Sequence, residues 1–167
     1  MRKEYKVVFD RLPADLEEMK AMPQAALKTP ADTAALTVAA LCAYAASPEK
    51  CYEMLDFLRG PRPLSPMEKQ FIRDRFMDGR DYIPRSYFEG AVPENDYTPG
   101  LPLTLVMKDN EGPVADPGYA RLALKSGGAD SLRIVTLRSK PSAGQWFLWD
   151  QMLLGGIRIP KSLDEWA

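Results

Sequence analysis

The sequence of 167 residues contains no histidine. Without an imidazole, the chain cannot build a Ser-His-Asp or Cys-His catalytic site, a histidine general base or a histidine-ligated zinc site. Only two cysteines occur, Cys42 and Cys51, and they are not spaced as a CxxC pair. Because two thiols are too few for a four-cysteine zinc or iron–sulfur site, we expect no metal centre and no cofactor.

The chain also lacks the sequence patterns that bind nucleotides and calcium. No GxGxxG or GxxxxGK[ST] pattern is present, and the pair Gly127-Gly128 lies between two predicted strands, away from any helix start. Asp109, Glu111 and Asp116 do not have the alternation of an EF-hand, so they are interpreted as solvated turn residues. Nucleotide hydrolysis and calcium binding are therefore disfavoured.

An excess of charge of one sign is missing too. Lys and Arg number 22 against 23 Asp and Glu, a net charge of −1, so no overall field attracts DNA, RNA or a membrane surface. The most apolar run, residues 34–46, is too short to cross a bilayer, and residues 1–9 do not fit a signal peptide. Cys42 and Cys51 lie in apolar helical patterns and are interpreted as buried structural thiols. We expect a cytoplasmic protein with no nucleic acid and no membrane as partner.

Three Ser/Thr-Pro pairs mark predicted helix starts in the first half of the chain. The hydroxyls of Thr29, Ser47 and Ser65 can accept hydrogen bonds from the free N–H groups of a first turn, and the proline after each suits the first helical position. Glu68 adds a capping box to Ser65. An alanine-rich run after Thr29, apolar stripes after Ser47 and Ser65, and an earlier amphipathic segment, residues 12–22, predict four helices.

The remainder of the chain predicts a sheet. Residues 79–102 mix aromatic residues with proline and glycine, which indicates an irregular, packed segment with one short strand. Short runs rich in β-formers follow, separated by turn residues, and predict antiparallel strands. These runs are Leu103–Met107, Tyr119–Lys125, Leu132–Arg138 and Gln145–Gln151. The tail predicts a further short strand at residues 157–160 and a docked end at Trp166.

These elements together predict a single α+β domain over residues 1–167. In this fold, N-terminal helices, about four of them, pack on a C-terminal curled antiparallel sheet of roughly four to five strands. The helical part covers residues 1–79, the irregular aromatic segment 79–102 and the sheet part 103–167. Apolar residues at both side-chain parities in the last strand indicate a sheet that is covered on both faces or strongly curled.

The C-terminal part of the chain reads LRSKPS over residues 137–142, GQWFLWDQ over 144–151 and IRIPKS over 157–162, and a weaker block covers residues 87–98. These blocks resemble a family of uncharacterised bacterial proteins. That family is known as a domain of unknown function, so the resemblance implies no activity. At the level of fold only, helices followed by a curled meander are similar to the cone-shaped roll of nuclear-transport-factor-like proteins, which include both enzymes and binding modules.

The run from Trp146 to Asp150 is the strongest candidate for a binding site. Since alternate residues of a strand face opposite ways, Trp146 and Asp150 are predicted to share one face. Beside Arg133 or Arg121 of a neighbouring strand, they would line a ligand pocket. The competing interpretation is that the aromatic residues of this run form ordinary core.

The sequence does not identify an activity, but it ranks three hypotheses. The missing catalytic residue types, the aromatic strand and the tyrosine-rich segment favour a non-catalytic module that binds a protein or a small ligand. The first alternative is an enzyme without histidine, with Asp150 as general base in a curled-sheet pocket. The second is a nucleic-acid-binding sheet, suggested by an excess of Lys and Arg between residues 119 and 161. Strand alternation places Arg133 and Arg138 on opposite faces, which disfavours such a surface.

Overall fold

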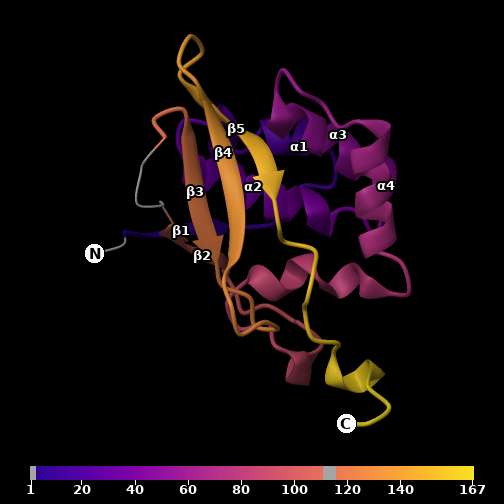
Figure 1. Cartoon of the computed structure of the whole chain (residues 1–167). Coiled ribbons are helices and arrows are strands. Elements are labelled where there is room, and N and C mark those ends of the chain that lie inside the picture. Colours follow the sequence, from indigo (N-terminus) through magenta and orange to yellow (C-terminus); the bar gives the residue numbers. More distant parts are fainter. Residues whose placement is uncertain (1–2, 111–115) are drawn as a thin grey trace.

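The computed structural model describes residues 3–110 and 116–167. Within that part of the chain, four α-helices accompany a five-stranded antiparallel sheet (Figure 1). The helices are α1 (Leu16–Lys20), α2 (Pro30–Cys42), α3 (Pro48–Arg59) and α4 (Pro66–Arg75). The strands are β1 (Glu4–Phe9), β2 (Leu103–Asp109), β3 (Tyr119–Leu124), β4 (Arg133–Lys140) and β5 (Gln145–Gln151). Short 3₁₀ helices occupy Pro23–Ala26, Arg80–Tyr82, Pro84–Tyr87, Pro93–Asn95 and Lys161–Leu163. The predicted α+β class is confirmed.

Hydroxyl caps begin α2, α3 and α4, as predicted. The hydroxyls of Thr29 and Ser47 each accept a hydrogen bond from the backbone N–H three residues later, at 3.1 and 3.2 Å. At α4, Ser65 and Glu68 form a capping box in which each side chain accepts from the other residue's backbone N–H at 3.1 Å. The proline after each cap leaves no N–H unpaired at the first helical position.

The core lies between α2 and one face of the sheet (Figure 1). The strands follow one another in the order β1-β2-β3-β4-β5, and each neighbouring pair is antiparallel. Residues 33–41 of α2 are all buried, and its many alanines allow the helix to approach the strands closely. The buried strand residues on this face include Val7, Phe9, Leu105, Met107, Leu122, Leu124, Val135, Leu137 and Leu148.

The sequence pattern does not predict β1, which precedes the helices and forms one edge of the sheet. It pairs with β2 from Glu4 opposite Lys108 to Phe9 opposite Leu103. Only three apolar residues follow the charged start of the chain, too few to identify a strand by alternation alone. The helical part of the chain therefore begins after a strand that belongs to the sheet.

Two predictions for the tail are wrong. Residues 157–160 form no strand. Their backbone makes one hydrogen bond to the neighbouring loop, from Arg158 N to Gly128 O at 2.9 Å, which is too few for a strand pairing. Trp166 is 89% exposed, so the predicted docked end is not formed either. Part of the predicted turn after β2, including Glu111, lies outside the described residues.

Aromatic side chains pack the irregular segment 79–102, as predicted. Tyr82 and Tyr97 stack with their ring centroids 5.5 Å apart, and both rings are buried. The short strand expected here is reduced to a single bridge between Phe88 and Leu105. β3 pairs with β2 only from Met107 to Asp109. The irregular segment lies beside the rest of β2, where it forms a wall at that end of the sheet.

Candidate functional site

Two of the four residues predicted to bind a ligand lie on one face of the sheet. Arg121 pairs with Thr136 and Thr136 pairs with Asp150, so these three residues form a row across β3, β4 and β5. Thr136 alternates with the buried Val135 and Leu137, which places the row on the face opposite α2. The side chains of Arg121 and Asp150 are exposed there, two strands apart.

Trp146 and Arg133 have structural partners instead. The carbonyl of Trp146 accepts from Thr33 Oγ1 at 2.7 Å, and its half-buried ring packs against the core. Arg133 donates Nε to the carbonyl of Gly155 at 3.1 Å and Nη2 to the carbonyl of Gly156 at 3.0 Å. Trp146 thus joins β5 to α2, and Arg133 holds the chain that follows β5.

A β-bulge in β5 changes which residues share a face. Thr136 pairs with Asp150 while the next residue, Leu137, pairs with Leu148, so Trp149 is the extra residue of the bulge. Apolar residues occur at both parities of this strand for another reason: Leu148 faces the core, whereas Phe147 on the other face packs against the turn at Gly60. Sequence alternation cannot detect the bulge, because it depends on the register of the neighbouring strand.

The predicted common face of Trp146 and Asp150 is wrong for this reason. Trp146 pairs with Ser139 and Asp150 with Thr136, and these two β4 residues lie on opposite faces. Asp150 is exposed, and among the described residues its side chain has no hydrogen bond or ion pair. It borders an open cavity of about 270 Å³ beside α4, but its exposed side chain is not buried as the enzyme alternative expects of a general base.

The aromatic strand instead lines a groove, which we call the arginine–tryptophan groove. It is an open cavity of about 380 Å³ between β4, β5 and the turn that follows α3. Its lining residues are Arg59, Pro61, Arg62, Arg138, Ser139, Lys140, Pro141, Phe147, Leu148 and Trp149. Its volume falls within the range of small-ligand sites, about 300–1,000 Å³.

Two guanidinium groups stack on the indole ring of Trp149. The guanidinium carbon of Arg62 lies 4.1 Å from the Trp149 ring centroid, and that of Arg138 lies 4.8 Å from it. Tyr119 meets Trp149 edge-on, with centroids 5.5 Å apart, and its hydroxyl accepts from Arg138 Nη1 at 2.7 Å. Cation–π attraction holds both arginines on the ring, and the hydrogen bond also holds Arg138, without neutralising either charge.

The end of α3 brings Arg62 to the sheet. Gly60 ends the helix with a φ of 61°, and a Cβ at this position would lie 2.5 Å from Cδ1 of Phe147. Only a glycine can therefore bring the turn so close to β5. Sequence reasoning missed Arg62 because the Gly-Pro turn that carries it gives no indication of which strand it touches.

The third arginine of the groove is neutralised. Arg59 is buried and forms a 2.7 Å ion pair with Glu68, while its Nε donates to the carbonyl of Arg62 at 2.9 Å. Partial burial raises the pKa of Glu68, but hydrogen bonds from Ser65 and the charges of Arg59 and Arg62 outweigh it and lower the pKa below its ordinary value. No aspartate or glutamate of the described chain lines the groove, which leaves two arginines and Lys140 as its charges.

Comparison with known proteins identifies the family of the chain. The model of a family described as Domain of unknown function (DUF6935) matches residues 11–161. The chain belongs to this family. The match extends the resemblance seen at the C-terminal half of the chain to nearly its whole length. No curated protein and no solved structure matches the chain, so its likeness to nuclear-transport-factor-like rolls stays a prediction.

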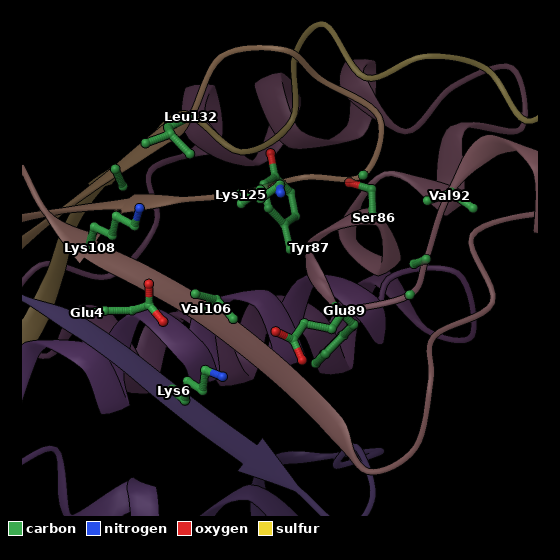
Figure 2. Close-up of a pocket in the computed structure, with 15 residues that line it drawn as sticks. Glu4, Lys6, Ser86, Tyr87, Glu89, Val92, Val106, Lys108, Lys125 and Leu132 are labelled. Carbon is green, nitrogen blue, oxygen red and sulfur yellow. The ribbon is translucent and has the colours of Figure 1, made fainter.

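The DUF6935 chain has another open cavity, which we call the lysine cavity (Figure 2). It measures about 460 Å³ and lies where the face opposite α2 meets the irregular segment. Its lining residues are Glu4, Lys6, Ser86, Tyr87, Phe88, Glu89, Gly90, Ala91, Val92, Val106, Lys108, Ala123, Lys125, Gly127 and Leu132. None of these residues belongs to the arginine–tryptophan groove.

Both cysteines of this DUF6935 chain are free. Burial of the thiol groups raises the pKa of Cys42 and of Cys51 to about 12, so both are protonated near neutral pH, and such thiols are poor nucleophiles. In residues 3–110 and 116–167, no three His, Cys, Asp or Glu side chains gather as a metal site would need. The helices of the same residues include none with the length and apolar character to span a membrane.

Proposed function

We propose that this DUF6935 protein is a non-catalytic binding module that takes an anionic ligand in the arginine–tryptophan groove. The observation that carries the proposal is the pair of guanidinium groups stacked on Trp149 in a groove that no carboxylate of the described chain lines. Lys140 adds a third positive charge at the same site.

Guanidinium chemistry supports an oxyanion as the ligand group. The planar fork of arginine offers two parallel N–H donors that match a carboxylate or a phosphate. Stacking on an aromatic ring holds the fork in place before the ligand arrives, which lowers the entropy lost on binding. The apolar side chains of Phe147 and Leu148 line the same groove and can hold an apolar part of the ligand.

Isothermal titration calorimetry with phenyl phosphate and with benzoate tests this proposal. Both probes join an oxyanion to a ring that can pack on Phe147. Binding is expected to weaken about tenfold or more in Arg138→Gln, because a hydrogen bond to a charged group contributes about 1.5–3 kcal/mol. Trp149→Ala is expected to weaken binding as well, since it removes the ring that positions both arginines.

Matched controls are available on the same molecule. Arg121→Gln removes an exposed arginine that does not line the groove, and Trp166→Ala removes an exposed tryptophan. Both variants are expected to bind the probes as the unmodified protein does. Equal loss of binding in Arg121→Gln and Arg138→Gln would show that general charge, and not the groove, attracts the anion.

The two alternatives give different outcomes. Hydrolase or isomerase turnover that disappears in Asp150→Asn would overturn the non-catalytic assignment. Retardation of RNA at low salt, with a steep loss of affinity as salt is added, would favour the nucleic-acid-binding sheet. The expected result is binding of the small anions with neither turnover nor RNA retardation.

We propose a bacterial, cytoplasmic setting and a single folded domain for the chain. Two free thiols, one of them in the core, support a reducing compartment. The pairing of β1 with β2 supports one domain, because it ties the start of the chain to the sheet that follows the helices. The resemblance of the C-terminal blocks to bacterial proteins supports the source.

A further inference from the structure

The lysine cavity gathers charged side chains on one face of the sheet. Glu4 and Lys108 pair across β1 and β2, and Lys6 pairs with Val106 one row further along. Lys125 directly follows β3, at the position that would lie opposite Val106 if the pairing of β2 with β3 continued by one residue. Figure 2 shows these side chains around the cavity, with Glu89 contributed by the irregular segment. Three lysines and two glutamates therefore surround one hollow.

The floor of the lysine cavity is apolar. Ala123 is fully buried and Val106 is half-buried at the centre of the lining. Phe88 and Ala91 are buried in the wall that the irregular segment forms, and Leu132 lies at the rim. A ligand with an apolar part can thus remove hydrocarbon surface from water at this site.

The wall of the cavity is fixed before any ligand binds. Gly127 N donates to Ser86 O at 2.8 Å, and the hydroxyl of Ser126 donates to that of Ser86 at 2.7 Å. A Cβ on Gly127 would lie 1.9 Å from the carbonyl oxygen of Ala91, so only a glycine allows the two loops to meet here. Preformed walls reduce the ordering that a ligand would otherwise require.

The charges of the cavity are not paired with one another. Among the described residues, no ion pair within 4.0 Å involves any of its three lysines or its two glutamates. Three ammonium groups against two carboxylates leave one positive charge in excess. A single carboxylate neutralises this excess, whereas each further negative charge on a ligand would leave the occupied cavity with a net negative charge.

From this arrangement we propose that the lysine cavity binds an amphiphilic monocarboxylate. Its carboxylate lies among the ammonium groups of Lys6, Lys108 and Lys125, and its apolar part rests on Val106 and Ala123. This site is separate from the arginine–tryptophan groove in its lining residues, and its lysines present point charges where the groove presents the planar forks of arginine.

Three probes separate the two parts of the recognition. Calorimetry or ligand-detected NMR is expected to show binding of octanoate, with acetate and octanol at least about tenfold weaker, because each lacks one of the two interactions. Absence of octanoate binding overturns the proposal. If acetate bound as tightly as octanoate, the apolar floor would not contribute to binding. If octanol bound as tightly, the ammonium groups would not contribute.

Variants locate the binding in the cavity. Lys108→Gln is expected to weaken octanoate binding about fivefold, and Glu4→Gln to strengthen it about threefold, because the first removes an attracting charge and the second a repelling one. Lys50→Gln, on the exposed start of α3, is the matched control and should leave binding unchanged.

Circular dichroism and the thermal midpoint of each variant show whether it is folded. A folded Lys108→Gln protein that binds octanoate as the unmodified protein does would contradict the proposal. Lys108→Gln and Arg138→Gln change different sites, so they show which site a carboxylate occupies, and either proposal can fail while the other holds.

Discussion

The turn at Gly60 allows a sharp test of how the arginine–tryptophan groove is built. The change Gly60→Ala adds a methyl group whose carbon would lie 2.5, 2.7 and 2.9 Å from three ring atoms of Phe147. It also forces an alanine to adopt a φ of 61°. Backbone strain of this kind costs about 1–3 kcal/mol, and overpacking costs about 1–3 kcal/mol more. The free energy of unfolding is therefore expected to fall by about 2–6 kcal/mol.

Gly79→Ala measures the strain of an ordinary left-handed glycine with no steric contact, whereas Gly60, with a φ of 61° and a ψ of −117°, has a conformation that is less favourable for alanine. Gly79 has a φ of 74°, and nothing lies within 4 Å of a Cβ at that position. Its free energy of unfolding is expected to fall by about 1–2 kcal/mol, the usual cost of a left-handed conformation. Urea unfolding followed by circular dichroism measures both variants. Equal losses in the two variants would refute the close contact between the turn and β5.

A second change identifies the ring as the obstacle. Phe147→Leu alone is expected to destabilise the protein, because it removes buried aromatic surface. In the Gly60→Ala background, the same change is expected to cost less or to restore stability, since a smaller side chain leaves room for the new methyl group. Strict additivity of the two losses would contradict this account.

Three further predictions concern the helix cap, the thiols and the domain. Ser65→Ala removes one half of the α4 capping box and is expected to lower the free energy of unfolding by about 0.5–2 kcal/mol in urea titrations, whereas Ser65→Thr should retain most of it. Burial raises the pKa of Cys42 and Cys51 from 9.0 to about 12, so the folded chain keeps protons that the unfolded chain releases. Their contribution to stability is complete below pH 9 and is lost as the pH rises towards 12. Unfolding titrations in alkaline buffers measure this loss, and a Cys42→Ala/Cys51→Ala protein is expected to lose less stability over the same pH range. Calorimetric and van't Hoff enthalpies are expected to agree, as for one cooperative domain, and a two-step transition would argue for separate units.

The helices were predictable because their signals are local. A cap such as Ser65 with Glu68 acts within one turn, and the apolar stripe behind it repeats every three to four residues, so neither depends on the rest of the fold. The hairpin strands β3, β4 and β5 were predictable for a similar reason, since short turns separate them. β1 was not predictable, because its partner β2 lies on the far side of all four helices in the sequence.

The candidate site depends on contacts between distant segments and was only partly predictable. The sequence indicates that the aromatic run of β5 has a special role, but it cannot locate the bulge at Trp149, which depends on the register of β4. Nor can it bring Arg62 to Trp149, because that contact requires the packing of α3 against the sheet. Arg121 and Arg133 were predicted as partners of Trp146 and Asp150 because they lie on neighbouring strands. The structure instead places Arg138 and Arg62 on the ring of Trp149.

The pairing of β1 with β2 has a consequence for the order of folding. The hairpins from β2 to β5 close over short turns, whereas β1 can pair only after the chain has been made through residue 108. Closing so large a loop is entropically unfavourable until the helices have brought its ends together. During synthesis, Val7 and Phe9 therefore remain exposed while the helical half emerges, and β1 is expected to join the sheet last. A nascent chain that stops before β2 would present these residues to chaperones, and a full-length chain would withdraw them.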